Sequence, residues 1–289
     1  MSMPPVLPLS RARVFIDGIF AEPVRLAHPE GVAVSADGAV WCGTETGHLL
    51  RVEPDGSAMV SYGCTNGWIA GLALHGGMLY ACDIRHGGVF RLEIAQRRLE
   101  RFSPSALAIP NYPVVDRRFD RLLVSDSVSF ESPGAGIWEM DLATGHGRLW
   151  CERPLHFANG MALAPDGRSL YVVESTRQRV ARIFIEDDGR PGLYEIVVEG
   201  VGEFPDGLAF DDGGRLYISC YEPSEIYRFS EAAGLELLIR DSKATLLAHP
   251  TNIAFRGATL FTTNLGRWHL TAIESDTYGT PLSAAGFGQ

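Results

Sequence analysis

The sequence has very little of several features on which common protein classes depend. Lys243 is the only lysine, and no cluster of Lys and Arg is longer than a pair. With a net charge of −10, the chain therefore offers no basic face for nucleic acid. The five cysteines are odd in number and lack C-x-x-C spacing, which argues against a disulfide framework, a structural zinc site and a dithiol redox centre.

Long apolar runs are missing as well. None approaches the roughly 20 residues that a membrane-spanning helix needs, and Met1–Arg13 lacks the charged-then-apolar layout of a secretory signal. We therefore expect a cytoplasmic protein with no membrane partner, whose cysteines are mostly buried, reduced thiols. The sequence also contains no G-x-S-x-G, no H-E-x-x-H and no phosphate loop, and its single lysine makes Schiff-base chemistry unpersuasive.

What the sequence does contain is an internal repeat. Each copy opens with a short apolar motif such as Asn159-Gly160-Met161-Ala162-Leu163, which leads to a second β-type run such as Leu170–Glu174. The copies begin near residues 30, 70, 111, 159, 206 and 252, so the period is 40 to 48 residues. This period is typical of a four-stranded propeller blade, and no stretch sustains a helical period.

Six copies predict an all-β protein, a six-bladed β-propeller with four-stranded blades that forms a single domain over residues 1–289. The sixth copy supplies only three strands, whereas the N-terminal run over residues 13–18 has no copy of its own. We expect this run to complete the last blade, so that the two ends of the chain close the ring and leave few open sheet edges. An all-β sandwich or two separate domains are the alternatives, and six registered copies favour the propeller.

The first strand of each propeller blade lines the central channel, so the residues that open the copies should converge near one end of the axis. These residues are Glu30, Ala70, Asn111, Asn159, Asp206 and Asn252. Five of the six carry side-chain oxygens, and burying two carboxylates without compensation is costly. Oxygen ligands favour a hard cation such as Ca²⁺ or Mg²⁺ over Zn²⁺. Alternatively, Asn and Asp open the copies only because they are good turn residues.

The second strand of each blade should return to the same mouth of the channel. Its end carries Glu45, Asp83, Asp126, Glu174, Tyr221 or Asn264. These groups could orient a substrate, support the cation ligands or only solvate the rim. Our predicted substrate contacts are Asn111, Asn252, Tyr112, Asp126, Glu174 and Tyr221. Three histidines, His28, His156 and His249, lie two or three residues before channel positions. They could carry protons at the mouth, or they could be loop residues that pack against a neighbouring blade.

Four segments together resemble a known family. They are Pro29-Glu30-Gly31, Asn159–Gly167, Pro205–Asp211 and Pro250–Phe255. They are similar to the SMP-30/gluconolactonase/LRE-like group of six-bladed propellers, which includes Drp35-type lactonases and diisopropyl fluorophosphatase-like phosphotriesterases. The resemblance implies that Glu30, Asn159, Asp206 and Asn111 hold one catalytic divalent cation, with Ca²⁺ favoured and Mg²⁺, Mn²⁺, Zn²⁺ and Fe²⁺ as alternatives.

One segment departs from the family pattern. Lactonases that act on sugar acids have Arg two residues before the position of Asn111 and Asp-Gly after it, whereas this chain has Ile109-Pro110-Asn111-Tyr112-Pro113. The loss of a cationic contact argues against an aldonolactone. The neighbouring Ile109, Tyr112, Trp68 and Phe157 favour a less polar ester or lactone.

The resulting hypothesis is metal-assisted hydrolysis of a small lactone or related ester, with the cation as Lewis acid and Asp206 as general base. A phosphotriesterase-like hydrolase at the same site is one alternative. The other is a non-catalytic propeller that binds a ligand, as in strictosidine synthase relatives.

Overall fold

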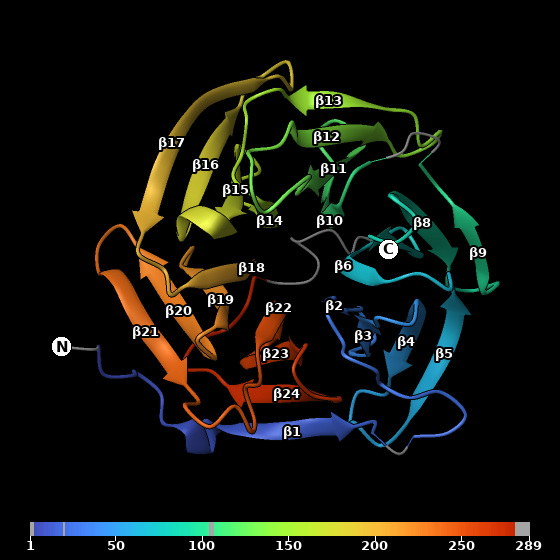
Figure 1. The fold of residues 1–289 in the computed structure, drawn as a ribbon, viewed down its shortest axis with the longest axis vertical. Coiled ribbons are helices and arrows are strands. Elements are labelled where there is room, and N and C mark those ends of the chain that lie inside the picture. Colours follow the sequence, from blue (N-terminus) through green and yellow to red (C-terminus); the bar gives the residue numbers. More distant parts are fainter. Residues whose placement is uncertain (1–2, 20, 104–106, 281–289) are drawn as a thin grey trace.

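Six four-stranded antiparallel sheets stand around a central axis; five are each built from one repeat, and the sixth combines the last repeat with the N-terminal strand (Figure 1). The computed structural model describes residues 3–19, 21–103 and 107–280, so the ends of the predicted domain 1–289 lie outside the described residues. In each blade the first strand of the repeat lies nearest the axis and the fourth lies at the rim. The prediction of a six-bladed β-propeller is confirmed.

The strands run from the axis outward in chain order. Blade 1 contains β2 (Val32–Val34), β3 (Val40–Gly43), β4 (His48–Val52) and β5 (Met59–Cys64). Blade 2 contains β6 (Ile69–His75), β7 (Met78–Asp83), β8 (Gly88–Glu93) and β9 (Arg98–Arg101). Blade 3 contains β10 (Pro110–Asp116), β11 (Arg121–Asp126), β12 (Gly136–Asp141) and β13 (Gly147–Cys151).

Blade 4 contains β14 (Ala158–Leu163), β15 (Ser169–Glu174), β16 (Arg179–Ile185) and β17 (Pro191–Glu199). Blade 5 contains β18 (Phe204–Phe210), β19 (Leu216–Glu222), β20 (Glu225–Ser230) and β21 (Gly234–Arg240). Blade 6 contains β22 (Pro250–Arg256), β23 (Thr259–Asn264) and β24 (His269–Glu274), with β1 (Ala12–Asp17) at its rim. The helical elements of the described residues are two 3-10 turns, η1 (Leu9–Arg11) and η2 (Ser175–Arg177), and neither is long and apolar enough to cross a membrane.

The core consists of apolar layers between neighbouring blades. Every residue of β11 is buried, because a sheet with a neighbour on each face has no solvent-facing side in its middle strands. One layer joins Leu123 of blade 3 to Leu170 of blade 4, and another joins Val40 of blade 1 to Phe261 of blade 6. The same packing buries four of the five cysteines, all of which are free thiols.

The N-terminal strand closes the ring as predicted. β1 pairs with β24 from Ala12 opposite Ile273 to Asp17 opposite His269, which gives blade 6 its fourth strand. Phe15 turns inward from β1 and packs edge-on against Phe261 of β23, with 4.8 Å between the ring centroids. The two ends of the sequence thereby form one blade, and the described ring has no gap between blades 6 and 1 (Figure 1).

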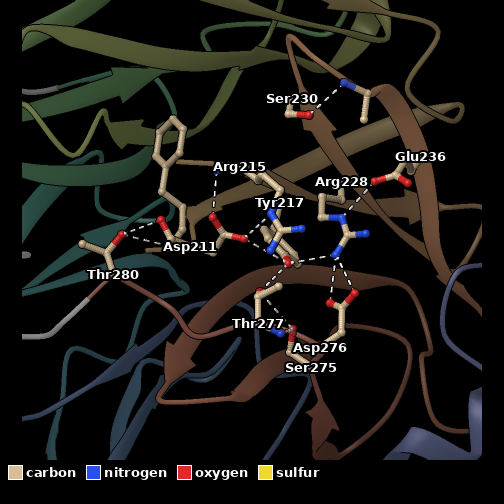
Figure 2. Close-up of polar contacts among 12 residues, drawn as sticks. Asp211, Arg215, Tyr217, Arg228, Ser230, Glu236, Ser275, Asp276, Thr277 and Thr280 are labelled. Carbon is tan, nitrogen blue, oxygen red and sulfur yellow. Dashed lines mark hydrogen bonds and ion pairs between the residues drawn. The ribbon is translucent and has the colours of Figure 1, made fainter. Parts of the chain in front are cut away.

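The segment Ser275–Thr280 that follows β24 crosses to blade 5 (Figure 2). Arg228 Nη1 donates to both carboxylate oxygens of Asp276, at 2.8 and 3.0 Å, and the hydroxyls of Tyr217 and Thr277 lie 2.7 Å apart. Thr280 Oγ1 donates to main-chain carbonyls at the end of β18, at 3.1 and 3.3 Å. This segment therefore ties blade 6 to blade 5 at the opposite end of β18 from Asp206.

The closing strand supplies a test of how much ring closure stabilises the fold. Phe15→Ala removes a side chain that is 6% exposed and should lower the free energy of unfolding by about 3 kcal/mol. Val14→Ala, on the 38%-exposed neighbour in the same strand, should change it by less than about 0.5 kcal/mol. Urea unfolding measures both changes in the free energy of unfolding. If Phe15→Ala lowered it as little as Val14→Ala, strand β1 would contribute little to the stability of the closed ring.

Candidate functional site at the hub of the ring

Five polar residues open the first strands at one end of the channel, and all are buried despite their polarity. We call Glu30, Asn111, Asn159, Asp206 and Asn252 the hub residues; each is 7% exposed or less. Asp206 lies close enough to Glu30 for the two charges to interact, and it also interacts with the side chain of Asn159. The structure therefore brings together, from blades 1, 4 and 5, residues that are far apart in the sequence.

Glycine follows the opening residue in four of the six repeats, three times after a hub residue and once after Ala70, because the blades meet there main chain against main chain. A Cβ atom on Gly160 would lie 2.3 Å from the carbonyl oxygen of Asp206, and one on Gly207 would lie 2.8 Å from Cα of Asn252. Gly31 and Gly71 meet the next blade in the same way. Only glycine permits this approach, so the Asn-Gly and Asp-Gly pairs of the repeat are packing requirements of the hub.

Each of the three hub amides donates from Nδ2 to a group outside the set of hub side chains. Nδ2 of Asn111 donates to Ser127 Oγ at 3.1 Å, and Nδ2 of Asn159 donates to Ser175 Oγ, also at 3.1 Å. Nδ2 of Asn252 donates to the main-chain carbonyl of Glu30 at 2.8 Å. The Oδ1 atom of each amide is left as a free acceptor.

Four buried oxygens at the hub accept no hydrogen bond. They are Oδ1 of Asn111, Asn159, Asp206 and Asn252, and they make up four of the seven buried side-chain nitrogen and oxygen atoms without a partner in the described part of the chain. Buried acceptors are normally satisfied, and leaving one unpaired costs about 1–3 kcal/mol. A concentration of unpaired oxygens at one point indicates a site built for a ligand that the protein itself does not supply.

The charge balance of the hub has the same implication. Burial raises the pKa of Glu30 to about 7, although Trp68 Nε1 donates to its Oε2 at 2.7 Å and lowers it. Burial, and then the charge of Glu30, raises the pKa of Asp206 well above its usual range. Among the described residues no Arg, Lys or His pairs with either carboxylate, so neither has a positive charge beside it to balance it when it ionises.

These donors fit a hard divalent cation. They are carboxylate and amide oxygens, the ligands that Ca²⁺ and Mg²⁺ take, whereas Zn²⁺ prefers nitrogen and sulfur. The described residues contain no group of three or more His, Cys, Asp and Glu side chains that could hold a metal. A cation at the hub would therefore depend on the asparagine oxygens as well as on Glu30 and Asp206.

Four of the six predicted residues at the ends of the second strands accept main-chain N–H groups from loops. Asp126 accepts the main-chain N–H groups of Ala108 and Ile109, at 3.0 and 2.8 Å, and Glu174 accepts that of His156 at 3.0 Å. Asp83 and Asn264 accept main-chain N–H groups from the segments that lead into β6 and β22. Each of these residues thus fixes the entry to the first strand of its own blade; a substrate contact by Asp126 or Glu174 stays a prediction.

Tyr112 occupies the position that is glycine in four other repeats. Its side chain is buried in the channel beyond the hub and lines a cavity of about 410 Å³ together with residues further along the first strands, such as Val34 and Leu163. Burial raises the pKa of Tyr112 to about 12, and the charge of Asp206 adds to the shift. Contact between Tyr112 and a substrate stays a prediction.

The three predicted histidines differ in their surroundings. His28 Nδ1 lies 2.6 Å from the carbonyl of Leu265, and Trp268 Nε1 donates to His28 Nε2 at 3.1 Å. His249 Nδ1 lies 3.0 Å from the carbonyl of Tyr221. Burial lowers the pKa of His156, and Arg177 lowers it further, which favours the neutral imidazole. None of these contacts joins a histidine to a hub residue.

Aromatic rings form a continuous series beside the hub. We call Phe130, Phe157, Phe204, Tyr221 and His249 the aromatic arc. Phe130 stacks on Phe157 with 4.0 Å between the ring centroids, and the ring of Phe204 lies 5.7 Å from that of Phe157. Tyr221 stacks on His249 at 4.6 Å. The rings of Phe204 and Tyr221 lie 6.2 Å apart and connect the three phenylalanines to this second pair.

The arc adjoins the hub rather than the far end of the channel. Phe157 and Phe204 each stand two residues before a hub residue, Asn159 and Asp206. Burial raises the pKa of Tyr221, and the charges of Glu222, Asp206 and Glu30 raise it further, so its hydroxyl lies within the field of both hub carboxylates. Phe130 leaves 62% of its surface exposed, which makes it an apolar face open to a ligand.

Sequence reasoning missed Ser127, Ser175, Phe130 and Phe204. Two patterns in the sequence could have indicated three of them. A serine follows the hub asparagine by 16 residues in both blade 3 and blade 4, and a phenylalanine precedes the hub residue by two in both blade 4 and blade 5. Phe130 belongs to no repeat pattern, because it lies between β11 and β12.

Comparison with known proteins gives the same picture of the fold. A family model described as the SMP-30/Gluconolactonase/LRE-like region matches residues 85–264, more than half of the chain, and a strictosidine synthase-like, N-terminal model matches residues 21–52. A gluconolactonase structure from Xanthomonas campestris has a TM-score of 0.70 at 18% identity and covers 86% of this chain and 88% of its own. Regucalcin of Agrobacterium tumefaciens, described as a calcium-binding protein, has a TM-score of 0.74 at 16% identity, with 96% and 98% covered.

Curated relatives match over shorter stretches. The 6-deoxy-6-sulfogluconolactonase of Pseudomonas putida is 29% identical over 108 residues, 36% of this chain and 36% of that protein. Lactonase drp35 of Staphylococcus aureus is 36% identical over 78 residues, 26% of this chain and 24% of that protein. The chain therefore matches about a third or less of the length of these relatives.

The uncompensated charge at the hub can be tested through stability. In chelator, at a pH above the raised pKa of Asp206, Asp206→Asn should raise the free energy of unfolding by about 1–3 kcal/mol, because it removes a buried negative charge that has no partner. With millimolar Ca²⁺ the gain should disappear, because the parent is then stabilised by ion binding. Thermal unfolding in both buffers measures whether the gain is present in chelator and absent with Ca²⁺.

Asp126→Asn is the matched control, because it neutralises a carboxylate that is equally buried and already holds main-chain N–H groups. It should destabilise the protein in both buffers. If Asp206→Asn behaved like this control in chelator, the hub charge would be compensated and our reading of the site would be wrong.

Proposed function

Because this chain belongs to the SMP-30/gluconolactonase/LRE-like family, we propose that it is a divalent-cation-dependent hydrolase that opens a lactone or a related ester. The observation that carries the proposal is the set of four unpartnered oxygens beside Glu30 at the hub. The names of the curated relatives, a sulfogluconolactonase and a lactonase, support the reaction class. Five free cysteines support a reducing compartment such as the cytoplasm.

Glu30, Asn111, Asn159 and Asp206 are the proposed cation ligands, and Ca²⁺ is the favoured ion. When bound, the cation supplies Lewis-acid polarisation of a carbonyl oxygen and stabilises the oxyanion that develops on it. Asn252 presents the same kind of free oxygen from blade 6 and is the proposed contact for the substrate or its attacking water. Two carboxylates then balance the two charges of the ion.

Asp206 is the proposed general base. Its Oδ1 atom is free, and the carboxylate would take a proton from the attacking water as the water oxygen bonds to the acyl carbon. The ring C–O bond then breaks, the same proton passes to the departing alkoxide, and the product is a hydroxy acid. Burial keeps Asp206 more basic than an exposed aspartate, and a cation beside it would lower its pKa again.

The aromatic arc and the departure near Asn111 support an apolar substrate. Ile109 stands where sugar-acid lactonases have Arg, and Phe130, Phe157 and Phe204 form a wall that offers ring faces and no hydrogen bonds. Such a wall binds an aryl or alkyl substituent through apolar burial and stacking. The proposed substrates are therefore lactones or esters with an apolar substituent.

The first test is loss of turnover without loss of structure. Asp206→Asn should lower kcat by about 100-fold or more, because a general base contributes about that much. Adding chelator to the parent should abolish turnover, and restoring Ca²⁺ should recover it. The assay is hydrolysis of a panel from aldonolactones to alkyl and aryl lactones, with an aryl phosphotriester included.

Asp55→Asn, in an exposed turn of blade 1, is the control and should keep parental activity. Turnover of lactones by Asp206→Asn at the parental rate would refute the assigned role. Cleavage of the phosphotriester alone would replace the lactonase proposal by a phosphotriesterase.

A second test addresses the arc. Phe130→Ala should raise KM for an aryl lactone by about 3- to 10-fold, because one stacked aromatic contact is worth about 0.5–1.5 kcal/mol. KM for the unsubstituted ring should stay unchanged. Leu193→Ala, which removes a similarly exposed apolar side chain on the outer strand β17, should affect neither substrate. Equal KM values for both substrates in Phe130→Ala would show that the arc does not contact substrate.

A further inference from the structure

Two buried serines make the same pair of hydrogen bonds in successive blades. Ser127 Oγ accepts from Nδ2 of Asn111 at 3.1 Å and donates to the carbonyl of Ala158 at 2.7 Å. Ser175 Oγ accepts from Nδ2 of Asn159 at 3.1 Å and donates to the carbonyl of Pro205 at 2.7 Å. Both serines are fully buried.

The direction of each hydrogen bond follows from proton counting. A serine hydroxyl has one proton, and a carbonyl oxygen can only accept, so the hydroxyl proton must go to the carbonyl of Ala158 or Pro205. The Oγ atom is then left with lone pairs and can only accept from the asparagine. Because the two ends of an amide have nearly the same shape, this partner decides which end faces the hub.

We propose that Ser127 and Ser175 are positioning residues that hold Oδ1 of Asn111 and Asn159 toward the hub and thereby set its affinity for a hard cation. The inference rests on the cation of the proposed function. Without the serine, Nδ2 of Asn111 or Asn159 loses the acceptor that holds it, and the amide is free to turn Nδ2 into the hub in place of Oδ1. The hub would then present donors where a cation requires acceptors.

We call each serine with its two hydrogen bonds a serine relay. Each relay also connects one proposed cation ligand to the next. Ala158 directly precedes Asn159, and Pro205 directly precedes Asp206. Each serine therefore joins the side chain of one hub residue to the main chain that carries the next, and the two relays connect Asn111, Asn159 and Asp206 across three blades. A shift of one blade would be transmitted to the ligand oxygens of its neighbour.

Ser125 provides a matched control two residues before Ser127. It is equally buried, and its hydroxyl donates to the carbonyl of Asn159 at 2.8 Å, so it also links blade 3 to blade 4. It accepts from the main-chain N–H of Tyr112 at 3.0 Å and holds no side-chain amide. Ser125→Ala and Ser127→Ala thus both remove an inter-blade hydrogen bond, and only Ser127→Ala releases a hub amide.

The experiment is calorimetric titration of the full-length parent, Ser125→Ala, Ser127→Ala and Ser175→Ala with Ca²⁺. Ser127→Ala and Ser175→Ala should weaken binding about 10- to 100-fold, which is the usual loss when a residue that orients a metal ligand is removed. Ser125→Ala should keep the parental Kd within about 2-fold, although its stability should fall about as much as that of Ser127→Ala.

A second measurement does not require the cation. In chelator, hydrogen exchange of the Asn111 side-chain amide, followed by NMR, should be slow in the parent and in Ser125→Ala and faster in Ser127→Ala. If Ser127→Ala keeps both the Ca²⁺ affinity and the exchange rate of Ser125→Ala, the positioning role is refuted. If the parent binds no Ca²⁺, the cation of the proposed function fails, and unchanged amide exchange in Ser127→Ala would refute the orientation independently.

Discussion

Unpaired oxygen at the hub is the constraint on which the rest of the structure depends. Two carboxylates and three amides are buried at one end of the channel, and four of their oxygens have no hydrogen-bond donor. Such an arrangement is unfavourable for an isolated protein and persists only if the surrounding fold fixes each group in place. The close main-chain contacts at Gly160 and Gly207, the serine relays and the closed ring all serve to hold these groups.

The contacts that tie blade 6 to blade 5 and the hub residues lie at opposite ends of the first strand of blade 5. β18 carries Asp206 at its start, whereas its end receives the segment Ser275–Thr280 that ties blade 6 to blade 5. β1 completes blade 6 at the outer rim. The tethers lie away from the hub, whereas the aromatic arc lies beside it, on the strands β18 and β19 and on the loops near them. In the proposed function, the chemistry is assigned to the hub residues and the substrate preference to the aromatic arc.

Much of the fold could be predicted because the repeated residues reflect packing requirements that recur from blade to blade. Four repeats place glycine after their opening residue, and the number of copies sets the number of blades. The closing role of the N-terminal strand followed from counting strands in the sixth copy. The convergence of Glu30, Asn159 and Asp206 followed in turn from the position of the first strands in a propeller.

The sequence does not predict which atom of a side chain makes a hydrogen bond, or which blade supplies its partner. The polarity of Asp126 and Glu174 led to a predicted substrate contact, which stays a prediction, but it did not indicate that their oxygens accept main-chain N–H groups of their own blades. Ser127 acts on Asn111 and Ala158 at once, and neither partner is close to it in sequence. Tyr112 replaces a repeated glycine and turns into the channel, where its surroundings come from several first strands. Contacts of this kind arise from packing between blades, which a linear pattern does not contain.

The central claim is that one hard cation is held by oxygens from separate blades. An anomalous-scattering map from crystals grown with Mn²⁺ tests it most directly. The account predicts a single strong peak among Glu30, Asn159 and Asp206, with Oδ1 of Asn111 directed toward it. A peak elsewhere, or an empty hub at saturating Mn²⁺, would contradict it.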